Sequence, residues 1–198
     1  MARCAIGIDL GTSNCALEWC ELGKLGSGGT SELEVSTFKI RQYESAERVI
    51  EQSVLPSFVY FHPEADSKRP YHVGLYARES LKDSPARCIH SAKSWLCHSG
   101  IDRESSILPW QSSQVGSSQK LSPVEASAAY LSYLRRSWDN AFKNRGPGYA
   151  FSEQQITVTV PASFDQVAQR LTLQAAKRAG FPESTRLLEE PQAAFLAW

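Results

Sequence analysis

A short polar turn near the start of the chain carries residue types that can bind phosphate. The turn follows an apolar segment that ends near Asp9, and its members are Gly11, Thr12, Ser13 and Asn14. Backbone N–H groups of a tight turn, together with two hydroxyl groups, can converge on an anion. A carboxylate beside bound phosphate is best used on the water shell of Mg²⁺, which keeps most of its waters. Asp9 is therefore a candidate magnesium-organising residue, and an ordinary hairpin with a capping aspartate is the alternative.

A second candidate carboxylate lies late in the chain. Glu190 stands between a predicted strand, Arg186–Leu188, and a helix that opens at Pro191. Open α/β sheets commonly place ligand-binding groups at such strand ends. The alternative is a solvated carboxylate that gains only the favourable field of a helix N-terminus. Glu190 considered alone does not distinguish these two interpretations.

The phosphate-type turn lies inside a predicted β-hairpin. Residues 4–10 and 16–20 are apolar segments on either side of it, and residues 33–42 alternate like a third strand. These three segments predict an antiparallel meander. Between them, residues 23–31 are crowded with Gly, Ser and Thr and predict a flexible surface loop.

Helices and strands alternate in the last third of the chain. The Ser-Pro-Val-Glu sequence that begins at Ser122 is a capping box with proline at the first helical position, and it predicts a long helix. Residues 155–160 are β-branched and predict a strand. A second helix, capped by Ser163 or Asp165, follows and ends at Gly180. Together with the meander, this repetition predicts a mixed sheet flanked by helices.

The middle of the chain has a different composition. From about residue 45 to 119 it is richer in Ser, Pro and His, with short apolar segments. Strands are predicted at 58–61 and 71–73, and a helix at 75–82. We expect this segment to be an insertion. Residues 111–119 have the lowest complexity and predict a loop or a hairpin tip.

Charge and hydropathy exclude several functional classes. The 198 residues include 21 basic and 21 acidic side chains, so the formal net charge is zero. A non-specific nucleic-acid binder or an anionic-membrane binder would have a strong positive field, and we expect neither partner here. Asp9 interrupts the first apolar run too early for a signal peptide, and no later run is long enough to span a bilayer. We therefore expect a cytoplasmic protein.

The cysteines and histidines show no metal-binding pattern. No CxxC pair or zinc-finger spacing occurs, so the cysteines are predicted to be reduced core thiols and the histidines to be surface or loop residues. The cysteines are Cys4, Cys15, Cys20, Cys88 and Cys97, and the histidines are His62, His72, His90 and His98.

Three motifs, taken together, resemble one protein family. Residues 6–14 (Ile-Gly-Ile-Asp-Leu-Gly-Thr-Ser-Asn) resemble the phosphate-binding signature that opens the nucleotide-binding domain of heat-shock protein 70 (DnaK-type) chaperones. Residues 157–164 (Thr-Val-Thr-Val-Pro-Ala-Ser-Phe), with Gln169 and Arg170, resemble a later motif of that family. Residues 190–194 (Glu-Pro-Gln-Ala-Ala) resemble another. Their order and separations are similar to those of the family, so the resemblance covers essentially the whole chain.

This resemblance implies an α/β fold of the ribonuclease-H-like, actin-like ATPase type. It has a mixed five-stranded sheet with flanking helices and a small inserted α/β subdomain. Subdomain IA would comprise residues 1–44 and 119–198, and subdomain IB residues 45–118. The rest of the ATPase domain and the substrate domain would lie beyond Trp198. We expect the chain to be a fragment, because its predicted last helix has no C-cap and finishes on large apolar residues.

The resemblance also implies roles for individual residues around ATP or ADP and Mg²⁺. Asp9 would order the waters of the metal, and the turn Gly11–Asn14 would hold the β- and γ-phosphates. Lys93 would reach the γ-phosphate and the attacking water. Glu190 would position the water shell of the metal or the nucleophile. A surface lysine is the alternative for Lys93.

Coupling between the nucleotide and a substrate domain is implied for Pro161 and Arg170. This sequence departs from the family here, with one more residue between the two than is usual. A solvated helix residue is the alternative for Arg170. The glycine usually found a little after the catalytic lysine is also replaced, near Cys97.

The implied function is that of a molecular chaperone active in protein folding and the stress response. The full-length protein would use ATP hydrolysis to bind and release unfolded polypeptides, with co-chaperones as further partners. The fragment alone is expected to be inactive. Two alternatives remain open at this point: an actin-like nucleotide-dependent assembly or scaffold protein, and a regulatory relative that binds ATP without hydrolysing it.

Overall fold

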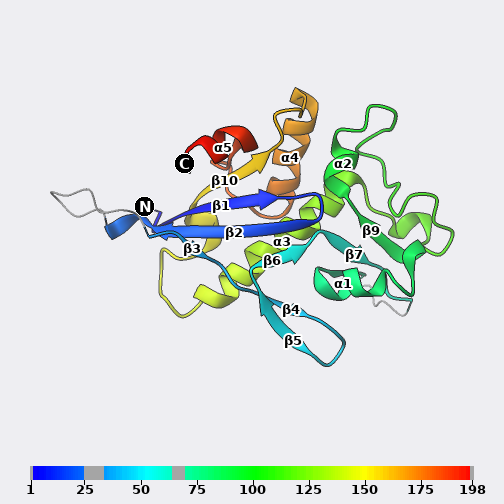
Figure 1. The fold of residues 1–198 in the computed structure, drawn as a ribbon, viewed down its shortest axis with the longest axis horizontal. Helices are drawn as coiled ribbons and strands as arrows, with labels where there is room; N and C mark the ends of the chain where they lie inside the picture. Colours follow the sequence, from blue (N-terminus) through cyan, green and yellow to red (C-terminus); the bar gives the residue numbers. More distant parts are fainter. Residues whose placement is uncertain (1, 25–33, 64–69, 197–198) are drawn as a thin grey trace.

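A mixed β-sheet organises the chain in the computed structural model, which describes residues 2–24, 34–63 and 70–196 (Figure 1). Within these residues the sheet has six strands, in the order β11-β10-β1-β2-β3, with β6 paired to the other end of β2. The strands are β1 (Cys4–Leu10), β2 (Asn14–Glu21), β3 (Ser36–Thr37), β6 (Val54–Pro56), β10 (Gln155–Val160) and β11 (Arg186–Glu189). Strand β10 is parallel to β1 and to β11, whereas β2 is antiparallel to its neighbours.

The predicted first hairpin is confirmed. Alternate residues of β1 are fully buried, and Ile8 faces Leu17 across the β1–β2 pair. This alternation fixes the register, because a slip of one residue would turn the buried side chains to solvent. The carboxyl end of β1, with Asp9, is thereby held at one edge of the sheet.

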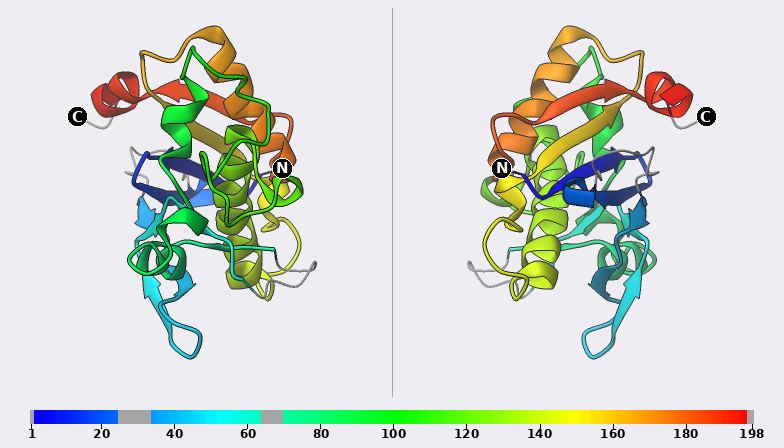
Figure 2. Two further views of the ribbon diagram at one scale, coloured as in Figure 1. Left: turned by 90° about the vertical axis from the view of Figure 1, so that its right-hand side faces the viewer. Right: turned by 90° about the vertical axis from the view of Figure 1, so that its left-hand side faces the viewer.

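Three helices flank this sheet. They are α3 (Pro123–Phe142), α4 (Gln166–Arg178) and α5 (Glu190–Leu196). Figure 2 shows α3 and α4 on one side of the sheet and α5 on the other. The capping box of α3 forms as predicted, because Ser122 Oγ accepts from Glu125 N at 3.1 Å and Glu125 Oε2 accepts from Ser122 N at 2.8 Å.

The second of these helices is capped by Asp165, not by Ser163. Asp165 Oδ1 accepts a hydrogen bond from Ala168 N at 2.6 Å. The helix is followed by Gly180 with φ +82°, as the sequence predicts for a glycine that ends a helix. Asp165 thus settles the alternative that the sequence left open.

Helix α3 provides much of the core. Trp138 is fully buried, stacks on Phe142 with ring centroids 4.0 Å apart, and meets Trp19 of β2 edge to face at 5.5 Å. Its indole Nε1 donates to Tyr149 O at 2.8 Å, so the ring is buried without an unsatisfied N–H. This aromatic cluster fixes α3 against the face of the sheet.

The middle segment adds two smaller sheets and two short helices. Strands β4 (Ile40–Tyr43) and β5 (Val49–Gln52) form a hairpin, and β7 (Phe58–Tyr60), β8 (His72–Val73) and β9 (Cys88–His90) form a three-stranded antiparallel sheet in the order β8-β7-β9. The helices are α1 (Leu75–Ser80) and α2 (Ala92–Leu96). Short 3₁₀ turns occur at Leu22–Lys24, Pro85–Arg87, Ser117–Gln119 and Phe151–Glu153.

The single strand predicted at 33–42 is wrong. Its described part divides into β3, which pairs with β2, and β4, which leaves the main sheet to pair with β5. Phe38 lies between them, buried, with its N–H bonded to Leu17 O at 2.9 Å. The continuous alternation therefore hid a change of partner strand.

The main sheet also has one strand more than the five predicted. Strand β6 pairs its three residues with Asn14–Ala16 at the start of β2. A strand this short that ends at Pro56 carries almost no periodicity, so sequence patterning does not detect it.

The remaining predictions about loops, the chain end and subdomains have mixed outcomes. The loop at 111–119 is confirmed, because Leu108 and Leu121 bridge at its base. Most of the predicted loop at 23–31 lies outside the described residues, as does Trp198. The division into subdomains IA and IB stays a prediction.

The thiol and histidine predictions hold only in part. All five cysteines are free, and Cys4, Cys15 and Cys88 are buried; Cys20 is half-buried and Cys97 is exposed, so these two are not core thiols. His90 lies in β9 but is exposed, as predicted for a surface residue, whereas His72 is half-buried in β8 and is neither a loop nor a surface residue. In the described part of the chain, no group of three or more His, Cys, Asp or Glu side chains could hold a metal ion.

None of the helices in the described ranges is long and apolar enough to cross a membrane.

Candidate functional site

The turn between β1 and β2 is too tight for a side chain at its first position. A Cβ atom on Gly11 would collide with the carbonyl oxygen of Asn14. Any other residue at position 11 would therefore force the backbone of the turn to move. The glycine allows this close approach.

A buried serine holds the turn from below. Ser57, which follows β6, donates its hydroxyl to Gly11 O at 2.8 Å and its backbone N–H to Ser13 O at 2.9 Å. The thiol of Cys15 lies 3.4 Å from the same hydroxyl. Burial raises the pKa of the Cys15 thiol to about 11, so this group stays protonated at neutral pH and is structural. These contacts fix the shape of the turn from the protein interior, so a ligand can approach it from the solvent side.

Asp9 is exposed at the carboxyl end of β1 and is oriented by a neighbouring strand. Thr159 lies opposite Asp9 in the parallel β1–β10 pair and donates its hydroxyl to Asp9 Oδ1 at 3.0 Å. Sequence analysis missed Thr159 as a site residue. Only the register between two strands 150 positions apart brings these side chains together.

Lys93 and Glu190 form an ion pair that joins the middle segment to the end of the chain. Lys93 Nζ and Glu190 Oε1 are 2.6 Å apart. The lysine side chain is 7% exposed, whereas that of the glutamate is 43% exposed. Lys93 lies on α2, which packs against α3 and α4. Its burial rules out the alternative of an ordinary surface lysine.

These groups meet at one polar cavity of about 500 Å³. It lies at the carboxyl ends of the parallel strands β1, β10 and β11, the edge at which open α/β sheets bind ligands. Asp9 and Thr159 are the second-last residues of β1 and β10, and Glu190 follows β11. Strand β1 points toward the end of the molecule that holds α2 (Figure 1). The lining residues are Asp9, Gly11, Thr12, Lys93, Thr159, Glu190 and Ala193.

The donor set suits Mg²⁺ held through water. Asp9 and Glu190 supply carboxylate oxygens and Thr12 a hydroxyl, and oxygen is the ligand type that Mg²⁺ prefers. The described residues offer no cluster of three or more acidic or histidine ligands for an all-protein cage. Mg²⁺ commonly uses one or two carboxylates together with phosphate oxygens and waters, and this cavity provides the carboxylates.

The remaining predicted site residues lie at varying distances from this cavity. Ser13 and Asn14 are exposed members of the same turn, but they are outside the cavity lining. Pro161 follows β10, half-buried, and its carbonyl accepts from Phe164 N at 3.0 Å. Arg170 is exposed on α4. The structure does not bring Arg170 to the cavity, and coupling through Pro161 and Arg170 stays a prediction.

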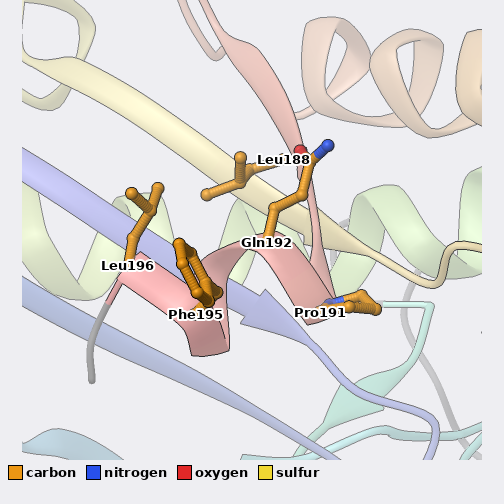
Figure 3. A pocket seen from close by; sticks show the side chains of 5 residues that line it. All are labelled: Leu188, Pro191, Gln192, Phe195 and Leu196. Carbon is orange, nitrogen blue, oxygen red and sulfur yellow. The ribbon is translucent and has the colours of Figure 1, made fainter.

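A second hollow of about 420 Å³ lies between β11 and α5 and is apolar (Figure 3). Leu188 contributes to it from the strand, and Phe195 and Leu196 from the helix, where they are 78% and 74% exposed. Among its described lining residues, Gln192 has the only polar side chain, and none of them carries a charged group that could hold a phosphate.

The fold and the cavity define a mixed α/β protein with a polar cavity at the carboxyl edge of its sheet. The family model described as Hsp70 protein matches residues 5–198. The chain therefore belongs to the Hsp70 family, a membership that implies the actin-like ATPase fold, and its mixed sheet is consistent with that fold.

Curated relatives agree with this assignment. The chain is 30% identical over 201 residues to the chaperone protein HscA of Enterobacter sp. (strain 638). It is 32% identical over 206 residues to the chaperone protein HscA homolog of Pasteurella multocida (strain Pm70). Each match covers 99% of this chain and 28% of the relative. The chain thus spans little more than a quarter of the length of the curated relatives that it matches.

Proposed function

We propose that this chain binds the phosphates of ATP or ADP, together with Mg²⁺, as part of the nucleotide-binding domain of an Hsp70-type chaperone. The observation that carries the proposal is the convergence of the glycine turn, Asp9, Lys93 and Glu190 on one cavity. These residues come from three segments far apart in the sequence. If the turn were only a hairpin connection and the ion pair only a structural contact, neither would need to lie beside the other at one cavity.

The chain's own residues suit phosphate binding in distinct ways. The turn is held by Ser57 from below, so its backbone N–H groups are fixed before a ligand arrives. Such preorganisation lowers the cost of binding. Asp9 is already oriented by Thr159 and would hold Mg²⁺ through its waters, with Glu190 as a second carboxylate in the cavity lining. When bound, Mg²⁺ would neutralise negative charge on the phosphate oxygens.

Lys93 supplies the positive charge for the terminal phosphate. Phosphoryl transfer depends on positioning and on neutralising spread negative charge more than on covalent chemistry. The Lys93 ammonium is held in the cavity by its ion pair with Glu190, at 2.6 Å. A bound phosphate would compete with Glu190 for this ammonium. The released, half-exposed carboxylate could then orient an attacking water.

The chaperone activity is proposed for the full-length protein. ATP hydrolysis would drive binding and release of unfolded polypeptides, assisted by co-chaperones. The support is family membership and the names of the relatives, which are chaperone proteins. Family membership favours this activity over an actin-like assembly protein. Binding without hydrolysis is the remaining alternative, and it makes a different experimental prediction.

The test uses Lys93→Ala in the full-length protein that contains this chain. We expect measurable Mg-ATP binding by calorimetry but loss of most single-turnover hydrolysis, because the turn and both carboxylates remain while the charge at the terminal phosphate is lost. Lys143→Ala, at the exposed end of α3, is the matched control and should leave both unchanged.

Three results would contradict parts of the proposal. Hydrolysis that is unchanged in Lys93→Ala would remove the assigned role of Lys93. Absence of hydrolysis in the unmodified full-length protein, with ATP bound, would favour the regulatory alternative. Absence of Mg-ATP binding would overturn the proposed site itself.

A further inference from the structure

A groove of about 720 Å³, larger than the nucleotide-type cavity, lies in another part of the molecule. Its walls come from the hairpin β4–β5, the residues around β8, helix α1 and helix α3. Figure 2 shows the hairpin beside the lower end of α3. The side chains that matter for the argument are Arg41, Tyr43, Tyr71, Tyr76, Tyr133 and Arg136. We refer to it as the tyrosine–arginine groove.

A hydrogen bond joins the groove wall formed by α3 to the wall formed by β4. Tyr133 of α3 donates its hydroxyl to the carbonyl oxygen of Arg41 on β4 at 2.9 Å. Burial raises the pKa of Tyr133 and of Tyr71, so both hydroxyls stay protonated at neutral pH, and the Tyr133 proton is used in the bond to Arg41. The hydrogen bond between Tyr133 and Arg41 therefore holds two walls of the groove together.

The charged side chains among the described residues that line the groove are two arginines, Arg41 and Arg136. Other arginines, such as Arg103 and Arg145, are paired with carboxylates. Among the described residues, neither Arg41 nor Arg136 forms a salt bridge. Glu51 lies opposite Arg41 in the β4–β5 pair without bonding to it, and Arg136 bonds only to the carbonyl of Ser132 on its own helix, at 3.3 Å. No Asp or Glu of the described segments lines the groove. An acidic ligand would be complementary to this surface.

The aromatic side chains favour a polypeptide ligand. Tyrosine and arginine are the residue types, with tryptophan, that dominate the energetics of protein interfaces. Tyr43 is 53% exposed although it is a large ring, and the other three tyrosines are partly buried in the groove walls. Such rings bury large area at low conformational cost, while guanidinium groups pair with carboxylates in two-pronged geometry.

We propose that the tyrosine–arginine groove is a docking site for an acidic peptide segment of a partner protein, with apolar side chains interleaved among its carboxylates. The carboxylates pair with Arg41 and Arg136. The apolar side chains pack on Tyr43 and Tyr76. This site is separate from the nucleotide-type cavity, since none of its lining residues is shared with it.

The test measures direct binding of a defined probe to the full-length protein. The probe is a fluorescein-labelled peptide of alternating Glu and Leu or Phe, and the comparison peptide has every Glu replaced by Gln. We expect saturable binding of the acidic peptide by fluorescence anisotropy, weakened by added salt. The Gln peptide should bind at least about tenfold more weakly, because its amides cannot replace charge-assisted hydrogen bonds.

Charge reversal identifies the surface. The double variant Arg41→Glu with Arg136→Glu should weaken binding of the acidic peptide by at least about tenfold, because attraction becomes repulsion. Tyr43→Ser, which changes an exposed side chain, should weaken it by about fivefold through lost contact area. Arg186→Glu, at an exposed site on β11 outside the groove, is the control and should change affinity by less than about twofold.

Distinct outcomes would overturn the proposal. Equal binding of the acidic peptide to the unmodified protein and to the double variant would place the peptide elsewhere. Equal affinity for the Glu and Gln peptides would remove the charge argument, and absence of saturable binding would remove the site. Mg-ATP binding should be unchanged in every groove variant, so a failure here is distinguishable from a failure of the proposed nucleotide site.

Discussion

Gly11 is the residue at which the turn can be tested most directly. Gly11→Ala places a Cβ against the carbonyl oxygen of Asn14, so the backbone must shift. We expect Mg-ATP affinity, measured by calorimetry on the full-length protein, to fall by more than about tenfold, because displaced N–H groups no longer converge on phosphate.

Gly7 provides the matched control for this substitution. It lies in β1, the strand that precedes the turn, and an added Cβ there would have nothing within 4 Å. Gly7→Ala should therefore leave nucleotide affinity unchanged and should slightly stabilise the fold by restricting the unfolded chain. Unchanged affinity in Gly11→Ala as well would show that the turn does not contact the phosphates.

Thr159 supports a second prediction at the residue scale. Thr159→Val keeps the shape of the side chain but removes the hydroxyl that donates to Asp9. Because Asp9 loses its orientation, we expect the apparent affinity for Mg²⁺ in the presence of ATP to fall by about threefold to tenfold. Thr159→Ser restores the hydroxyl and should recover most of this loss.

Thr157 lies two residues earlier on the same face of β10 and opposite Gly7, so Thr157→Val is the control. The readout is the Mg²⁺ dependence of ATP binding, which a general loss of stability would not change selectively. Equal effects of Thr157→Val and Thr159→Val would contradict the assigned role of Thr159.

The local parts of the site could be predicted from sequence, and the parts set by register could not. Asp9 and Gly11 lie in one short segment, so their types and spacing are visible directly. Lys93 was assigned through a family resemblance, and its burial against Glu190 depends on how α2 packs. Ser57 and Thr159 reach the site only through the pairing of distant strands, β6 with β2 and β10 with β1. A sequence pattern does not show which residues of two distant strands lie opposite each other.

At the scale of elements, the long helices could be predicted from the sequence, and the shortest strands and helices could not. Helix α3 has a capping box and a buried face over many turns, and it forms as predicted. Strands β3 and β6 have two and three residues, and helix α2 has five. Elements of this length are too short for a period of two or of 3.6 to be measured, and tertiary contacts alone decide where they form.

The start of helix α4 makes a testable electrostatic prediction. The N–H of Ala168, followed by the guanidinium of Arg103, holds the pKa of the Asp165 carboxyl below its usual value. A lowered pKa means that the ionised carboxylate stabilises the fold at pH values above the ordinary pKa of aspartate, about 3.9, and that this contribution is lost as the pH falls through the lowered native value.

Asp165→Asn isolates the charge, because asparagine is also a good N-cap. We expect Asp165→Asn to lower the Tm at pH 7 by less than Asp165→Ala does. The difference in Tm between the unmodified protein and Asp165→Asn should shrink as the pH is lowered from 7 toward 3. A difference that stays constant over this range would contradict the role of the carboxylate charge.

At the scale of the whole molecule, the sheet brings phosphate-type groups together but provides little to hold a base. Among the described residues that line the cavity, Ala193 is the only one with a purely apolar side chain. No aromatic ring of the described segments lines this cavity. Affinity contributed by this chain should therefore come from the phosphates and Mg²⁺, with little discrimination among bases.

Because the described cavity lining offers groups for phosphate but few for a base, the behaviour of the 198-residue chain alone can be predicted. The chain is prepared by itself and shown by circular dichroism to be folded. We expect it to bind Mg-ATP at least about hundredfold more weakly than the full-length protein, because its contacts reach only the phosphate end of the nucleotide. It should also bind Mg-GTP within about threefold of Mg-ATP, since the base makes few contacts. Calorimetry with both nucleotides measures both ratios. Micromolar or tighter binding of Mg-ATP, or a strong preference for ATP over GTP, would mean that these residues contain a base-binding surface, and the division of roles inferred from the cavity lining would be wrong.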